Sequence, residues 1–179
     1  MSGKFFVILL VLAGAVAGVS LYYLQVYGYY RDVVASPGAD VVLLDAASGE
    51  PVAIAYADFQ AIDSDSSPIR YRACFTTSLA LDVLTAKYMP ADKAVPRNAP
   101  FWFDCFDAAA IGADLSSGRA VAFISRKNVH YGVDRIAAIT ADGRGYVWHD
   151  LNDCGEKAYD GTVVGEECPP RPAATSETN

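Results

Sequence analysis

The sequence predicts an α+β protein in which an N-terminal transmembrane helix precedes a disulfide-stapled, mainly antiparallel sheet with two helices. Three observations support this fold class. An uncharged apolar stretch of about 20 residues lies near the start of the 179-residue chain. Short apolar segments separated by turn residues follow it, with two helical segments between them. Four cysteines, an even number, all lie beyond the apolar stretch.

The apolar stretch, residues 5–24, contains neither a charge nor a proline. As a helix rising about 1.5 Å per residue it is about 30 Å long, the thickness of the hydrocarbon core of a bilayer. Lys4 precedes it, which favours a cytoplasmic N-terminus and a C-terminal domain on the other side. Tyrosines gather at its far end and indicate an aromatic belt at the outer leaflet. They are Tyr22, Tyr23, Tyr27, Tyr29 and Tyr30.

Two short patterns inside the stretch carry further hypotheses. Ala15-Val16-Ala17 resembles a signal-peptide cleavage site, but the apolar run continues past it, which favours a retained anchor. Gly14 and Gly18 form G-x-x-x-G, and small residues four apart let a second helix approach closely in lipid. We therefore expect two partners for the anchor, the bilayer and a helix of another membrane protein.

The composition divides the chain into four parts. Residues 1–30 form the membrane anchor with its aromatic belt, 31–40 a breaker-rich connector, 41–168 the α+β domain, and 169–179 a proline-rich disordered tail. Beyond residue 30 the chain carries 13 basic and 21 acidic side chains, a net charge of −8. This balance disfavours nucleic acid as a partner, because nucleic acid requires a basic footprint.

The first half of the domain reads as strands followed by a helix. Residues 41–44 and 52–56 form a hairpin, and 62–68 form a polar loop. Residues 69–75 alternate between apolar and polar, which is typical of a strand. A Thr-Thr-Ser segment then caps a helix at about 79–88.

The second half begins with an aromatic-rich segment, 101–106, which we interpret as core packing or a staple at the start of a helix. That helix begins at Asp104 or Asp107 and ends at about Ser117, before Gly118. Strands follow at 119–125, 133–140 and 145–149. The loop between the first two strands holds His130, an Asp-Gly turn joins the last two, and 152–168 form a small hairpin.

Cys74, Cys105, Cys154 and Cys168 are predicted to form two disulfides. Closing the loop between Cys154 and Cys168 is worth about 3 kcal/mol, and closing the one between Cys74 and Cys105 about 3.5–4 kcal/mol, in the chain-entropy model. Three pairings are possible, and the sequence does not choose among them.

A rival hypothesis makes Cys105 a nucleophile. Asp104-Cys105 lies at a predicted helix start, where the helix dipole lowers the pKa of a thiol, and His130 and His149 follow on or near strands. This arrangement resembles the NlpC-type cell-wall cysteine peptidases. The resemblance implies a cysteine-dependent hydrolase of cell-wall peptides with Cys105, His130 and His149 in catalytic roles.

Other chemistry finds less support, and we expect no metal or cofactor. The polar run at 149–153 is interpreted as a turn with capping groups, because neighbouring strand residues point to opposite faces. Arg70 and Arg72 share one face of their strand and are a candidate site for a carboxylate or phosphate, or a solvated surface. Nucleotide-binding and serine-hydrolase motifs are absent from the sequence, so an enzymatic role stays uncertain and is not favoured.

Several motifs resemble one family over nearly the whole chain. They are R-Y-R-A-C-F at 70–75, W-F-D-C-F at 102–106, Y-G-V-D-R at 131–135, D-G-R-G-Y-x-W-H at 142–149 and C-G-E at 154–156. The family is a group of small anchored proteins from Rhodobacter-type alphaproteobacteria, catalogued as a domain of unknown function. The resemblance implies an inner-membrane protein with a periplasmic domain, and it implies no activity. The leading hypothesis is an accessory or scaffold protein of another inner-membrane protein, and the alternative is the periplasmic hydrolase.

Overall fold

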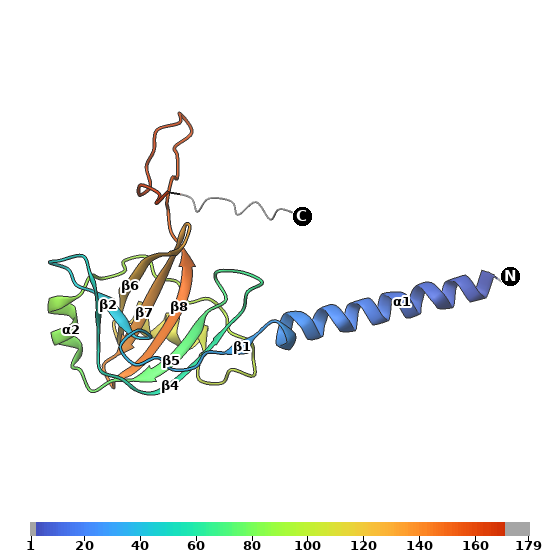
Figure 1. Ribbon diagram of the computed structural model, residues 1–179, viewed down its shortest axis with the longest axis horizontal. Helices are drawn as coiled ribbons and strands as arrows, with labels where there is room; N and C mark the ends of the chain where they lie inside the picture. Colours follow the sequence, from blue (N-terminus) through green and yellow to red (C-terminus); the bar gives the residue numbers. More distant parts are fainter. Residues whose placement is uncertain (1–2, 171–179) are drawn as a thin grey trace, which may run out of the picture.

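The computed structural model describes residues 3–170. It consists of an exposed N-terminal helix and a domain built on an antiparallel sheet that is covered on both faces (Figure 1). The helical elements are α1 (Gly3–Tyr23), the π-helical turn η1 (Leu24–Gly28), α2 (Leu81–Lys87) and α3 (Ala108–Ser116). The strands are β1 (Arg31–Asp32), β2 (Val42–Leu44), β3 (Pro51–Ala53), β4 (Ala57–Asp63), β5 (Arg72–Thr76), β6 (Ala120–His130), β7 (Val133–Thr140) and β8 (Arg144–Leu151). The predicted α+β class is confirmed.

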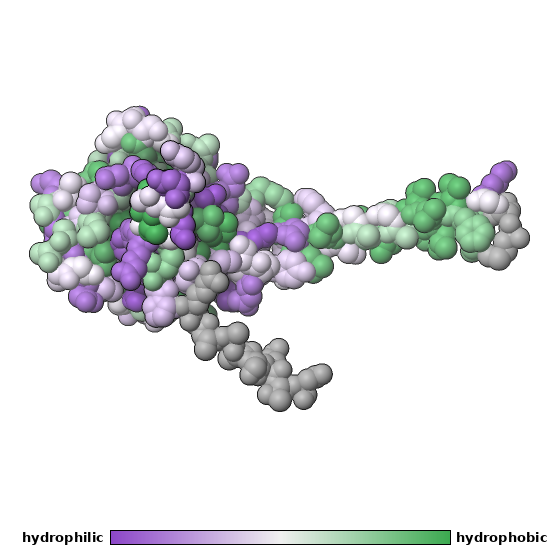
Figure 2. Space-filling view, turned by 90° about the horizontal axis from the view of Figure 1, so that it is seen from above, coloured by the Kyte–Doolittle hydropathy of each residue, from purple (hydrophilic) through white to green (hydrophobic). Residues whose placement is uncertain are grey.

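Helix α1 projects from the domain and buries none of its residues against the rest of the chain (Figure 1). Figure 2 shows apolar residues along this helix, whereas hydrophilic residues are spread over the domain. Together with η1 it forms one helix, Gly3–Gly28, that is long and apolar enough to cross a membrane. An apolar helix of this length needs an apolar partner, which the domain does not supply.

The main sheet has six strands in the order β1-β4-β5-β8-β7-β6, and every neighbouring pair is antiparallel. Strands β2 and β3 form a separate antiparallel hairpin, as predicted. Two features differ from the sequence prediction. The expected connector begins with β1, which pairs with β4, and β4 itself was not predicted. A shift of register between Ala57 and Gln60 and a positive φ of 52° at Asp58 break the alternation there.

Both faces of the sheet are buried. One face packs Tyr71, Phe75 and Val147 against the β2–β3 hairpin and the buried Leu84 of α2. The other face packs Cys74, Ile136, Trp148 and their neighbours against α3 and the segment before it. The alternation predicted for residues 69–75 is therefore correct, but its polar face is covered rather than solvated.

Helix α3 begins where the sequence predicted. The Asp107 side chain accepts hydrogen bonds from the backbone N–H groups of Ala109 (2.9 Å) and Ala110 (3.1 Å). These bonds satisfy two donors that a helix start otherwise leaves unpaired. Gly118 follows the helix with a φ of 73°, a conformation that glycine adopts without a steric penalty.

Strand β6 is longer than predicted and extends to His130. Its pairing with β7 continues to that residue through two shifts of register. His130 thus ends a strand instead of lying in a loop. The Asp-Gly turn between β7 and β8 is present, with a φ of 85° at Gly143. The predicted disordered tail falls mostly on residues 171–179, which lie outside the described residues.

Two disulfides join Cys74 to Cys105 and Cys154 to Cys168, with Cα–Cα distances of 6.2 and 4.9 Å. The first joins β5 in the sheet to the segment before α3, so it fixes the packing of that segment on the sheet. The second closes the turn-rich segment that follows β8. This segment stands away from the end of the sheet in Figure 1.

Candidate functional site

An aromatic cluster packs around the C-terminal end of the anchor. The Tyr27 ring stacks on Tyr23 at 5.9 Å and on Trp102 at 6.2 Å, and it meets the edge of Phe101 at 6.0 Å, all between ring centroids. The Trp102 indole nitrogen donates a 2.7 Å hydrogen bond to the backbone carbonyl of Val26. The segment before α3 is therefore bound to the last turn of the membrane-type helix.

A second loop holds the same turn. Arg70, just before β5, donates to the side-chain oxygen of Gln25 at 2.7 Å and to its backbone carbonyl at 3.2 Å. Its guanidinium also lies over the Tyr30 ring, 5.5 Å from the centroid. Two loops from different parts of the domain thus converge on one helix end, and the backbone that follows enters the sheet as β1. We call this set of contacts the anchor–domain junction.

The sequence interpretation of residues 101–106 was only partly correct. Phe103 and Phe106 are core residues, as expected. Phe101 is 69% exposed and contacts the anchor, whereas Trp102 packs against the core cluster and also contacts the anchor, so both rings contribute to the junction. The density of aromatic residues at 101–106 and at the end of the anchor was the signal available, but nothing local indicated that the two clusters meet.

The cysteine–histidine set of the rival hypothesis is not assembled. Cys105 is bonded to Cys74 and is not a thiol nucleophile. His130 and His149 do lie together, with ring centroids 5.9 Å apart. However, His149 packs beside Tyr71 on one face of the sheet, whereas Cys74 and Cys105 belong to the cluster on the other face.

His149 has a structural environment. Its ring stacks on Tyr71 at 4.8 Å between centroids. Its Nδ1 donates to the carbonyl of Pro68 at 2.8 Å, so its Nε2 accepts from Nε of Arg135 at 3.0 Å. Burial and the Arg135 charge lower the pKa of His149 from 6.5 to about 3. Both ring nitrogens of the neutral His149 are thus hydrogen-bonded. These bonds link β8 to β7 and to the loop before β5.

Arg72 does not lie on a solvated face, which corrects the sequence interpretation. It is 5% exposed, and its guanidinium donates to four backbone carbonyls at 2.6–2.9 Å. The acceptors are the carbonyls of Ile69, Tyr71, Arg97 and Asn98. Burial lowers the pKa of Arg72 to about 10, so the side chain keeps its charge at neutral pH.

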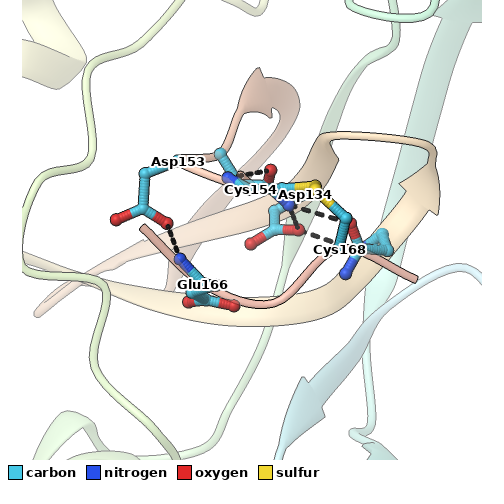
Figure 3. The surroundings of a disulfide bond; sticks show 7 residues. Asp134, Asp153, Cys154, Glu166 and Cys168 are labelled. Carbon is cyan, nitrogen blue, oxygen red and sulfur yellow. Dashed lines mark hydrogen bonds between the residues drawn. A yellow bond between two sulfur atoms is a disulfide. The ribbon is translucent and has the colours of Figure 1, made fainter. Parts of the chain in front are cut away.

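The region around the second disulfide is polar and acidic (Figure 3). The Asp153 side chain accepts from the backbone N–H of Glu166 at 3.3 Å, and the buried Asp134 accepts from the side-chain amide of Asn152 at 2.7 Å. These residues border a groove of about 500 Å³ next to the disulfide. Asp150, in the predicted polar run, pairs with Arg97 at 2.5 Å. Across residues 3–170, no group of three or more His, Cys, Asp or Glu residues is placed to hold a metal ion.

These features define a class: an α+β domain held by two disulfides and joined to one apolar helix of membrane-spanning length. Disulfides of this kind persist in oxidising compartments. The chain belongs to the family of unknown function DUF6446, which matches residues 41–169. No curated protein and no solved structure gives a significant match.

Proposed function

We propose that this chain is a single-pass inner-membrane protein whose periplasmic domain acts as an accessory or assembly partner of another membrane protein. The cytoplasmic N-terminus is supported by Lys4, which precedes the apolar helix. The periplasmic side is supported by the two disulfides, because the cytoplasm keeps thiols reduced. The alphaproteobacterial origin is supported by the motif resemblance.

The anchor–domain junction is the observation that carries this proposal. A flexible tether would only localise the domain, and it would need no specific contacts with the helix. Here Trp102, Arg70 and Tyr27 fix the end of the helix to the domain. The helix is not covered by the domain, and the domain is held on it in a fixed orientation. The surface of the helix and the surface of the domain can therefore contact one partner at the same time.

The partner-facing side of the helix is proposed to be the one with Gly14 and Gly18. A Cβ atom added at either position meets nothing within 4 Å, so residues 3–170 do not fill this side of the helix. Small residues four apart allow close packing of a second helix in a bilayer. The proposed role is one of contact, and Cys105, the cysteine suggested as a nucleophile, is in a disulfide and does not supply a thiol.

Crosslinking in native membranes, followed by mass spectrometry of the purified adducts, tests the proposal. Gly14→Leu with Gly18→Leu is expected to abolish a specific adduct with another membrane protein. Leu9→Val with Val16→Leu, at exposed positions on the opposite side of α1 from the two glycines, is the matched control and is expected to keep it. An unchanged set of adducts in the glycine variant, or a chain without any specific adduct, would contradict the proposal.

A further inference from the structure

We propose that a cavity at the anchor–domain junction binds the phosphate-bearing head group of a membrane phospholipid. The inference rests on the proposed membrane anchoring and adds a ligand to it. The cavity has a volume of about 550 Å³. It lies between the end of the anchor, at Gln25 and Val26, and the domain residues Arg70, Arg72 and Phe101.

The position of the cavity suits a lipid head group. Helix α1 has 21 residues, which at about 1.5 Å per residue spans the hydrocarbon core of a bilayer. The cavity borders η1, the turn that directly follows, so it lies at the depth where the helix leaves the hydrocarbon. Lipid phosphates lie at this level, and so do the tyrosine and tryptophan rings of membrane proteins.

The charge of the cavity is the second reason. Two arginines line it, and no acidic residue of the described chain does. Arg70 and Arg72 donate to neutral oxygens of Gln25 and of backbone carbonyls, and within residues 3–170 neither has a carboxylate within 4.0 Å. Asp150 acts on Arg72 only from beyond ion-pair distance and is itself paired with Arg97. A pair of arginines without a carboxylate partner is unexpected in a domain with an excess of acidic residues, and an anion would balance it.

The two arginines have different roles in this site. Arg72 is buried and is held by four hydrogen bonds to backbone carbonyls, so it contributes a fixed positive charge at the wall of the cavity. Arg70 is half-buried, and its bond to the Gln25 side chain is with a neutral amide. A phosphate oxygen can replace that amide with a shorter and stronger charge-assisted bond.

The apolar side of the cavity favours a lipid over free phosphate. Phe101 is 69% exposed, yet it lies 6.0 Å from the Tyr27 ring at the end of the anchor. A large apolar ring at this depth is stabilised by the interfacial region of a bilayer and gains nothing from water. The cavity therefore offers a cationic side for the phosphate and an apolar edge for the glycerol and the first acyl carbons.

Native mass spectrometry of the full chain in mild detergent, titrated with phosphatidylglycerol, tests the inference. We expect one lipid per chain, and we expect Arg70→Gln to weaken its binding about tenfold or more, since it removes a charged hydrogen bond. Arg144→Gln is the matched control, because Arg144 is exposed and pairs with Asp142 away from the junction. Equal lipid binding in the two variants would overturn the inference.

Two further arms keep the outcome interpretable. Inorganic phosphate or glycerol phosphate that displaces the lipid at equal concentration would point to a free-anion site and overturn the choice of a lipid. Arg70→Lys keeps the charge and is expected to bind lipid better than Arg70→Gln, which separates loss of binding from loss of folding. Failure of the unsubstituted chain to bind the lipid, with its membrane crosslinks intact, would contradict this inference alone, whereas absence of the chain from the membrane fraction would contradict the proposed function.

Discussion

The indole nitrogen of Trp102 donates a 2.7 Å hydrogen bond to the backbone carbonyl of Val26, 76 residues earlier in the chain. This bond closes the junction between a helix of membrane-spanning length and a disulfide-linked domain. It also satisfies a carbonyl at the C-terminal end of the anchor, where a helix leaves its last carbonyls without intrahelical partners. The orientation of the domain relative to the anchor depends on this contact and on those of Arg70.

Removing this bond is expected to loosen the junction without unfolding the sheet. Trp102→Phe keeps an aromatic ring but loses the hydrogen-bond donor. The free energy needed to open the junction locally should therefore fall by about 1 kcal/mol. Tryptic cleavage after Arg31, which begins β1 just beyond the junction, should then become about fivefold faster in detergent. Phe5→Leu, at the other end of the anchor, should leave the rate unchanged. An unchanged cleavage rate in Trp102→Phe would mean that the indole bond does not hold the junction closed.

The two disulfides are expected to differ in their effect on stability. Replacing Cys74 and Cys105 by serine should lower the free energy of unfolding by about 3–4 kcal/mol, because Cys74 is buried in the sheet. Replacing Cys154 and Cys168 should cost less. Their loop is largely exposed, so the native hairpin gains freedom together with the unfolded chain. Urea denaturation of both double variants measures the difference, and equal losses would contradict this account.

His149 is expected to make stability depend on pH. Its pKa is about 3 in the folded chain and about 6.5 when unfolded, so the unfolded chain binds the proton first as the pH falls. The stability due to this group is therefore complete above pH 6.5 and is lost between pH 6.5 and about 3. From pH 7.5 to 5.5 the loss is about 1.4 kcal/mol.

Urea denaturation at these two pH values isolates this contribution. His149→Gln should lose about 1.4 kcal/mol less than the unsubstituted chain over this interval. Val163→Ala is the control, because Val163 is 57% exposed and carries no ionisable group. The same pH dependence in the His149→Gln variant and in the parent would show that the buried imidazole is not the group responsible.

Gly145 is expected to tolerate no side chain. A Cβ atom there would lie 2.1 Å from the Phe75 ring, which is 3% exposed and held in the core. Gly145→Ala should therefore cost about 1–3 kcal/mol, the range for overpacking a core. Gly112→Ala is the control: it lies in α3, nothing is within 4 Å of its Cβ position, and alanine favours a helix by about 0.5–1 kcal/mol. Thermal unfolding distinguishes the two, and similar midpoints would contradict the packing around Phe75.

The sequence predicted those parts of the fold that depend on neighbouring residues. Asp107 caps α3 because its carboxylate reaches the N–H groups two and three residues on, a relationship contained within one turn of chain. The alternation at 69–75 likewise placed Tyr71 and Arg72 on opposite faces. Strand β4 escaped prediction because the bulge near Asp58 breaks its alternation.

The candidate site was less predictable, because it depends on contacts between distant segments. Arg72 is buried by carbonyls of Arg97 and Asn98, which belong to a loop with no strand or helix pattern. For Trp102 the sequence predicts core packing or a staple at a helix start, and nothing in it indicates the contact with Val26, in a part of the chain interpreted only as a membrane belt. Residue types indicated an aromatic cluster and an arginine pair, but only the tertiary structure brings them to one helix end.

We propose that a disulfide-linked domain is held on the oxidising side of a membrane by its anchor. The most direct measurement is non-reducing peptide mapping of the full chain, alkylated in intact membranes before solubilisation. We expect two linked peptide pairs, one joining Cys74 to Cys105 and the other Cys154 to Cys168. Four alkylated cysteines, or a chain recovered outside the membrane fraction, would contradict it.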